Sequence, residues 1–243
     1  MQDTLLSIRQ AAEKLHCSLD TMRRWDKKGK LRSVRKKPRG HRYYSDEAIE
    51  KFLIGRKDLF ARALKWMREK PQEPEAPFYC QNSMAFKIEL ARMEKRILEM
   101  QGAQDYFPLI IAVAGEIGNN SFDHNLGNWP DIPGIFFGYR LDQRIVVLAD
   151  RGRGILQTLR NVINDIRDDK EALRIAFTEV ISGRAPEARG NGLKFVRETV
   201  VQYPLKLFFQ TGGAVLKLEK NDPVMRISSA RTYLRGCIAM ISF

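Results

Sequence analysis

The sequence contains few cysteines and histidines, and those present are dispersed. The three cysteines, Cys17, Cys80 and Cys237, lie far apart without a Cys-x-x-Cys pair, and the three histidines form no cluster. A structural zinc site needs closely spaced ligands and a disulfide framework needs paired thiols, so this distribution argues against both. It fits free thiols in a reducing compartment.

Long apolar runs are also lacking. No stretch of about 18 apolar residues could cross a bilayer, and the N-terminus has no apolar signal segment. We therefore expect a cytoplasmic protein with no membrane partner.

Positive charge, in contrast, is in excess and is concentrated in the first third of the chain. The formal net charge is +13. Residues 1–70 hold 20 Lys and Arg against 9 Asp and Glu, a net charge of +11, whereas residues 71–243 hold 22 against 20. A local positive field favours a polyanion such as DNA, RNA or an anionic membrane. The alternative is a basic face that is simply solvated.

A proline-rich segment, residues 71–77, predicts a boundary between two parts. Its three prolines cannot continue a helix and favour an extended connector. We therefore expect a first domain at 1–70, a linker at 71–77 and a second domain at 78–243. The apolar stripe of the helix predicted at 86–100 covers only about two heptads, fewer than a coiled coil needs. We expect this helix to pack on its own domain.

The first third predicts two short helices joined by a tight turn. Ser7 and Gln10 form a capping box at the start of one helix, and Ser18 is a good N-cap for a second helix at 19–28, which Gly29 ends. Such a pair is the helix-turn-helix arrangement, whose second helix enters the major groove of DNA. The polar side chains expected to face DNA from this helix are Thr21, Arg23, Arg24 and Lys27.

A basic hairpin follows at 31–44, and Ser45 caps a third helix that continues from residue 54 to 70. The hairpin can lie along phosphates or in a minor groove. Its expected DNA contacts are Arg35, Lys36, Lys37, Arg39, His41, Arg42 and Tyr43.

Residues 4–55 resemble the winged helix-turn-helix of the MerR and excisionase group. The motifs that carry the resemblance are Ser7-Ile8 with Ala11-Ala12, the run 22–25, the run 29–31 and the wing sequence 39–45. The resemblance implies a homodimer on an inverted repeat in double-stranded DNA, with Arg24 and the wing arginines at the interface. The alternative is a basic helical domain that binds a protein.

The second part carries three motifs in order. Glu116, Asn120 and His124 are spaced by four residues, so they share one face of a predicted helix. Burying such a polar stripe without a ligand is costly, and an exposed stripe is the alternative. The sequence Asp150-Arg-Gly-Arg-Gly154 follows a strand pair at 135–139 and 144–149, so its carboxylate can accept a hydrogen bond from an amino group.

The third motif, residues 189–193, places glycines at the start of a helix predicted at 193–201, where backbone N–H groups can face phosphate. The remaining strands are predicted at 205–210, 214–218 and 236–243, with a Thr-Gly-Gly turn between the first two.

Together the three motifs resemble those of the GHKL superfamily, which includes gyrase, MutL, histidine kinases and anti-sigma serine kinases, over residues 78–243. The resemblance implies an α+β chain in which the small winged helix-turn-helix precedes a two-layer α/β sandwich of the Bergerat type with a mixed sheet. It implies ATP and Mg²⁺ as ligands and Glu116 as the general base that activates water. It assigns the nucleotide to Asn120 (through Mg²⁺), His124, Asp150, Gly152, Gly154, Arg184, Arg189, Gly190, Gly192 and Leu193, with an ATP lid at 182–189. Gly115, Gly118, Ser121 and Lys194 depart from the pattern.

Three functions remain open at this point. The first is a transcription regulator whose DNA or partner binding is controlled by Mg-ATP. The second is an anti-sigma-like serine/threonine kinase or partner-switch protein acting on a small STAS-like partner, and the third is a DNA-processing or phage-defence ATPase. Whether the chain is an enzyme is open, a weak ATPase or a kinase being the possibilities. A histidine kinase is not expected, since none of His16, His41 and His124 precedes a suitable helical pair.

Overall fold

The structure is a computed structural model that describes residues 5–15, 17–35, 40–100, 104–179, 191–222 and 224–243. The chain divides into two compact units, residues 1–58 and 59–243. Among the described helices, none is both long and apolar enough to cross a bilayer.

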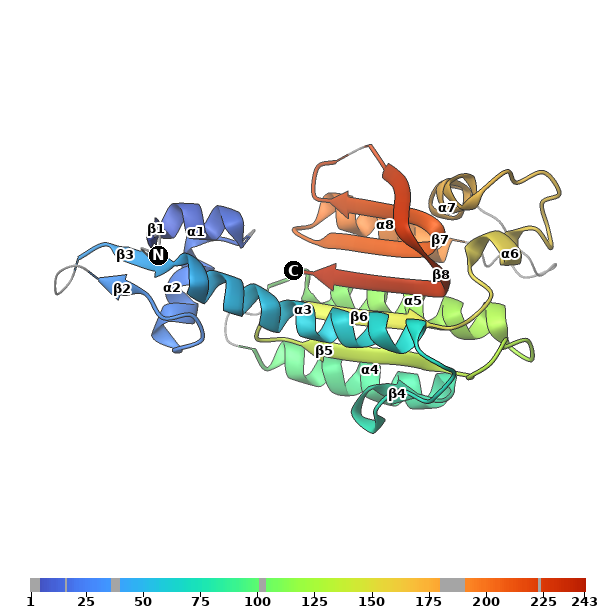
Figure 1. Cartoon of the computed structure of the whole chain (residues 1–243), viewed down its shortest axis with the longest axis horizontal. Coiled ribbons are helices and arrows are strands. Elements are labelled where there is room, and N and C mark those ends of the chain that lie inside the picture. Colours follow the sequence, from blue (N-terminus) through green and yellow to red (C-terminus); the bar gives the residue numbers. More distant parts are fainter. Residues whose placement is uncertain (1–4, 16, 36–39, 101–103, 180–190, 223) are drawn as a thin grey trace. The chain divides into compact units, whose positions relative to one another are not determined.

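The first unit consists of short helices and a small antiparallel sheet (Figure 1). In the described residues the sheet has the strand order β1-β3-β2. Its elements are β1 (Leu5–Ser7), α1 (Ile8–Lys14), α2 (Leu19–Lys27), β2 (Val34–Arg35), β3 (Arg42–Ser45) and the start of α3 (Asp46–Arg68).

Local capping sets the helix limits in this unit, as the sequence predicts. Ser7 and Gln10 form both hydrogen bonds of the capping box of α1, and the Ser18 side chain accepts from Thr21 N at the start of α2. Gly29 has a φ of +69°, a conformation that favours glycine, just after α2. The Ser45 hydroxyl accepts from Ala48 N in the first turn of α3. These predictions are confirmed.

Helix α3 crosses the limit between the two units. It begins at Asp46 and ends at Arg68 as one continuous helix. From Leu59 onward its apolar side chains are buried in the second unit, so this unit begins well before the proline-rich segment at 71–77. The proline-rich segment ends the helix, but it does not mark where the packing of the second unit begins.

The second unit is built on one large antiparallel sheet. Among the described residues its strand order is β4-β5-β6-β8-β7. Its strands are β4 (Tyr79–Cys80), β5 (Ile135–Arg140), β6 (Ile145–Asp150), β7 (Lys206–Glu219) and β8 (Arg226–Ser242). Its helices after α3 are η1 (Ala76–Phe78), α4 (Ser83–Leu98), α5 (Phe107–Asn125), α6 (Ile155–Leu159), α7 (Asp169–Thr178) and α8 (Gly192–Gln202).

The expected mixed sheet is wrong, because every strand pair among the described residues is antiparallel. β5 and β6 form a hairpin, and so do β7 and β8. The helices between β6 and β7 lead the chain across β8, so β7 pairs with β8 and not with β6. β6 and β7 run in the same direction, but β8 lies between them, so they are not neighbours.

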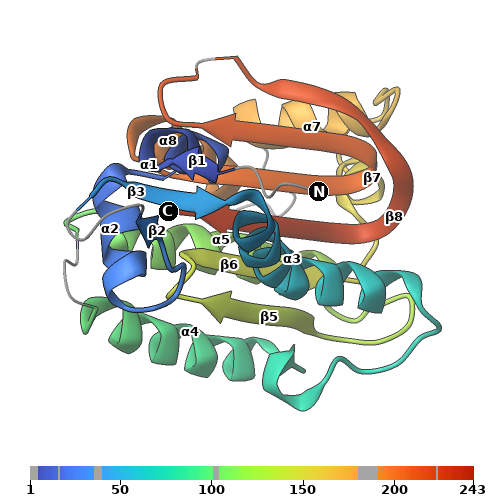
Figure 2. The ribbon, with the colours of Figure 1, turned by 60° about the vertical axis from the view of Figure 1, so that its left-hand side comes forward.

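Helices cover both faces of the sheet, so the expected two-layer sandwich is wrong as well. Val146 and Leu148 of β6 pack in one cluster with α4, α5, α7 and α8, whereas Ile145, Val147 and Ala149 pack in the other. The second cluster contains the end of α3, through the buried side chains Leu59, Ala63, Trp66 and Met67. Figures 1 and 2 show this part of α3 on one side of the sheet, with α4 and α5 on the other.

The predicted Thr-Gly-Gly turn is instead a bulge within one long strand, β7. Gly212 has a φ of +53°, and a Cβ there would overlap the Asp169 carboxylate. The Gly213 N–H donates to Asp169 Oδ2 at 2.8 Å. The two glycines therefore bend the strand around a side chain at the start of α7, and the chain does not reverse there.

Helices α4 and α5 pack closely through the glycines of α5. A Cβ at Gly118 would overlap the ring of Phe86, and one at Gly115 would come within 3.3 Å of Leu90. Close packing of α4 therefore offsets the helix propensity that glycine costs, about 1 kcal/mol relative to alanine. The prediction that the helix at 86–100 packs on its own domain is confirmed.

Candidate functional site

Helix α2 places basic side chains at the surface of the first unit. Arg23 and Lys27 are exposed and Arg24 is half-buried. Thr21 is only 8% exposed, and its hydroxyl lies 3.0 Å from Ser18 Oγ. Thr21 therefore contributes to the start of the helix, whereas the three basic residues form its solvent-facing part.

Asp26 joins α2 to the wing strands β2 and β3. Its Oδ2 accepts from Arg42 Nε at 2.7 Å, its Oδ1 accepts from Ser33 N at 2.8 Å, and Arg35 lies 3.8 Å away. Burial would raise the pKa of Asp26, but the hydrogen bonds from Ser33 and Arg42 hold it below its ordinary value. Arg42 therefore has a structural role in addition to any DNA contact.

The rest of the wing is described in part. His41 is exposed and Tyr43 is half-buried, while Tyr44 is buried in the core. Burial raises the pKa of Tyr44 to about 12. The other wing residues expected at DNA, Lys36, Lys37 and Arg39, lie outside the described residues.

The second unit contains a pocket between α5, the end of β6 and α6. The space within it, including the open mouth, is about 540 Å³. Its apolar lining is Ile117, Ile155, Leu159, Ala176, Leu193 and Phe209. Its polar lining is Asn120, Ser121, His124, Asn125, Asp150 and Thr158, and Gly154 and Cys237 complete it.

Asp150 is the buried charged group of this pocket. It is 2% exposed, its Oδ1 accepts from Gly152 N at 2.8 Å, and its Oδ2 accepts from the Ser121 hydroxyl at 2.8 Å. Burial raises the pKa of Asp150 to about 6, although these bonds and one from Cys237 N–H lower it. Asp150 is therefore mostly ionised at neutral pH inside a largely apolar pocket.

The glycines around Asp150 permit close packing within the protein. A Cβ at Gly152 would overlap the Asn125 amide, and one at Gly236 would overlap the Asp150 carbonyl. Gly154 has a φ of +78° and lies at the start of α6, where Thr211 Oγ1 accepts from Ile155 N at 3.2 Å. The spaced glycines therefore permit close packing inside the protein, independently of any ligand.

Glu116 and Asn120 meet the start of α8. A Cβ at Gly192 would overlap Glu116 Oε2 and would come within 3.5 Å of Asn120 Nδ2. His124, one turn further along α5, is exposed and lines the pocket. Of the predicted residues, the pocket lining includes Asn120, His124, Asp150, Gly154 and Leu193, whereas Glu116, Gly152 and Gly192 are not part of it.

Some predicted residues cannot be placed, and some important ones escaped prediction. Arg184, Arg189, Gly190 and the expected lid at 182–189 lie outside the described residues. Asn125 was missed, although its Oδ1 accepts from Arg153 N at 2.9 Å and holds the loop after β6. Thr211 was missed because its role depends on contacts with a distant loop.

Comparison with known proteins bears on the first unit. Residues 6–57 match the family model described as MerR HTH family regulatory protein. No curated protein matches the chain. The match spans α1, α2, β2 and β3 and ends within α3. The N-terminal part of the chain is therefore a MerR-type helix-turn-helix, which implies DNA binding and a role in transcription regulation.

Proposed function

We propose that the chain is a transcription regulator whose DNA or partner binding is controlled by ATP and Mg²⁺ in the pocket of the second unit, in the manner of the GHKL superfamily. The observation that carries the proposal is Asp150. A carboxylate that is 2% exposed at the end of a strand, in a mostly apolar pocket, is costly to ionise, so a further donor from a ligand would stabilise it.

The hydrogen-bonding capacity of Asp150 fits an adenine amino group. An ionised carboxylate has about four acceptor positions. The structure shows donors from Gly152, Ser121 and Cys237, which leaves room for one further donor. The apolar walls from Ile155 and Phe209 suit the faces of a planar base. Guanine and hypoxanthine present an acceptor at the equivalent position, so the pocket should favour adenine.

The phosphate end is supported by the start of α8. Backbone N–H groups at a helix N-terminus favour anions, and Gly192 keeps that end free of a side chain. Glu116 lies against Gly192, so a bound phosphate would meet a negative charge unless a cation were present. Asn120 offers an amide oxygen of the kind that Mg²⁺ accepts. Bound Mg²⁺ would supply the charge neutralisation that phosphates need at this end.

Glu116 also bears on the question of turnover. Its carboxylate lies beside Gly192 at the proposed phosphate end, so it could accept a proton from an attacking water. We therefore keep Glu116 as the candidate general base. If it has this role, Glu116→Gln should retain ATP but release phosphate about 10²–10⁴-fold more slowly.

Titration calorimetry on the full chain tests nucleotide binding. ATP with Mg²⁺ should bind, and inosine triphosphate should bind about 10-fold or more weakly, because losing a donor to a buried acceptor costs about 1–3 kcal/mol. Asp150→Asn should lose most of this preference. Asp142→Asn makes the same chemical change in the exposed turn between β5 and β6 and should keep it. Equal binding of both nucleotides, or of neither, contradicts the pocket assignment.

Fluorescence anisotropy with duplex DNA tests the regulatory part. The affinity for DNA should change when Mg-ATP saturates the wild-type chain and should stay unchanged in Asp150→Asn. If the wild-type affinity is the same with and without bound ATP, the nucleotide does not control DNA binding, and control of a protein partner becomes the version to test.

A further inference from the structure

Arg151 follows Asp150 directly, yet its side chain lies on the opposite face of the sheet. Successive side chains of an extended strand point to opposite faces. In β6 the residues 145, 147 and 149 pack against α3, whereas 146 and 148 pack on the α5 side. The alternation continues past the strand, since Asp150 lines the pocket and Arg151 lies against Trp66. Two adjacent residues thus reach the pocket and α3.

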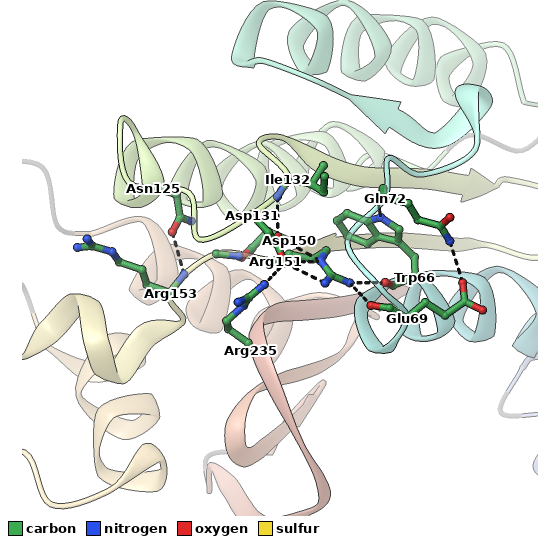
Figure 3. A network of polar contacts seen from close by, with 11 residues as sticks. Trp66, Glu69, Gln72, Asn125, Asp131, Ile132, Asp150, Arg151, Arg153 and Arg235 are labelled. Atoms are coloured by element: carbon green, nitrogen blue, oxygen red, sulfur yellow. Dashed lines mark hydrogen bonds and ion pairs between the residues drawn. The ribbon is translucent and has the colours of Figure 1, made fainter.

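Arg151 binds the C-terminal end of α3 (Figure 3). Its Nη1 donates to the carbonyl oxygen of Trp66 at 2.7 Å and to that of Glu69 at 3.1 Å. Its guanidinium lies 5.8 Å from the centre of the Trp66 ring, and the residue is 5% exposed. The last carbonyls of a helix lack intrahelical donors and carry partial negative charge, so a buried cation stabilises them.

The same guanidinium is held from a second side by Asp131, in the loop before β5. Nη2 lies 2.9 Å from Asp131 Oδ2, and Nε lies 3.3 Å from both carboxylate oxygens. Arg235 of β8 also pairs with Asp131. Burial would raise the pKa of Asp131, but the hydrogen bonds from Arg151 and Ile132 hold it below its ordinary value. The Asp131 carboxylate therefore neutralises the buried positive charge of Arg151.

Hydrogen bonds connect the pocket carboxylate, the loop after β6 and the end of α3 in one series. The Asp150 carboxylate accepts from Gly152 N, so the peptide segment that carries Arg151 is tied to the pocket carboxylate. The guanidinium is planar, and its donors are fixed relative to one another. A ligand that fixes Asp150 therefore also fixes the donors that Arg151 presents to Trp66 and Glu69.

We propose that Arg151 is a positioning residue that couples nucleotide occupancy of the Asp150 pocket to the C-terminal turn of α3. This inference rests on the proposed function for the nucleotide itself. Helix α3 begins at Asp46, within the first unit, and ends at Arg68. The coupling would therefore give the pocket a physical connection to the helix that follows the DNA-binding wing.

Hydrogen–deuterium exchange on the full chain, with and without saturating Mg-ATP, tests the coupling. In wild type, ATP should slow exchange at residues 65–72 by about 5-fold or more, the lower end of typical coupling between sites. Arg151→Lys keeps the charge but cannot make the same set of planar bonds, so it should bind ATP and lose this slowing. The matched control Arg235→Gln also removes a cation from Asp131, yet it leaves the bonds to α3 and should keep the slowing.

The design separates this inference from the proposed function. Retention of the ATP-dependent slowing in Arg151→Lys overturns the coupling, because a merely structural arginine would change exchange equally with and without ATP. Should Arg151→Lys not fold, Asp131→Asn loosens the same guanidinium and should reduce the slowing. If wild type binds no ATP, the proposed function fails. In that case the coupling predicts that Arg151→Lys speeds hydrogen–deuterium exchange in both segments, residues 65–72 and residues 150–154. Faster exchange in only one of the two segments overturns the coupling.

Discussion

Asp150 should make the stability of the second unit depend on pH in the direction opposite to most carboxylates. Burial raises its pKa from an ordinary value of 3.8 to about 6, so the folded chain retains a proton that the unfolded chain has released. The resulting stabilisation is fully present below the unfolded pKa and is lost as the pH rises through the folded one. At 1.36 kcal/mol for each pH unit between the two values, it amounts to about 3 kcal/mol.

Urea unfolding of the full chain between pH 4 and pH 7, followed by tryptophan fluorescence, measures this contribution. Asp150→Asn keeps the size of the side chain but does not titrate. Carboxylates with lowered pKa values, such as Asp26 and Asp131, titrate alike in both proteins, so the difference between wild type and variant isolates Asp150. Relative to the variant, wild type should lose roughly 2 kcal/mol between pH 4 and pH 7.

If the curves of wild type and Asp150→Asn run parallel from pH 4 to pH 7, Asp150 is not a buried carboxylate with a raised pKa. A ligand would then not be needed to stabilise an ionised Asp150.

Three further predictions concern individual contacts. Ser121→Ala removes a hydrogen bond that lowers the pKa of Asp150, so more of the carboxyl group is protonated at pH 7. Calorimetry should show the ATP affinity reduced roughly 10-fold at pH 7 and less at pH 8. Equal losses of affinity at both pH values would contradict this prediction. Arg42→Gln breaks the partly buried pair with Asp26 and should destabilise the first unit by about 1–2 kcal/mol in thermal unfolding, besides shallowing the salt dependence of DNA binding by up to about 0.9; an unchanged melting temperature would make the pair dispensable. Gly118→Ala should lower stability by about 1–3 kcal/mol in urea unfolding despite the better helix propensity of alanine, because its Cβ would overlap an aromatic ring of α4; a gain in stability would refute that close packing.

Features fixed by neighbouring residues are those that the sequence predicts well. The capping box of Ser7, the N-caps Ser18 and Ser45 and the left-handed Gly29 all depend on contacts within a few residues. Their chemistry is complete in the local sequence, since the hydroxyl and the backbone N–H that it caps lie within one turn. The winged helix-turn-helix consists largely of such features, which explains why residues 6–57 are recognisable on their own.

Features fixed by distant residues are those that the sequence predicts poorly. The Thr-Gly-Gly segment has the composition of a turn, but Asp169, 44 residues earlier, holds it as a bulge. Ser121 departs from the superfamily pattern in the local sequence, yet its hydrogen-bond partner Asp150 lies 29 residues away. In each case the local sequence contains the donor or the flexible residue, whereas the acceptor that decides its role comes from another element.

The packing of α3 on the sheet depends on two apolar patterns, one in β6 and one in α3. Neither pattern alone identifies the surface that it packs against. The consecutive apolar residues 145–149 of β6 are typical of a strand buried on both faces, a pattern that the expected two-layer sandwich did not take into account. The spacing of Leu59, Ala63, Trp66 and Met67 predicts one apolar face on α3 without saying what it covers. Only their pairing in space shows that the alternation of β6 assigns Asp150 to the pocket and Arg151 to α3. This alternation of side chains, and not any single motif, puts Asp150 in the candidate pocket and the next residue, Arg151, against the end of α3.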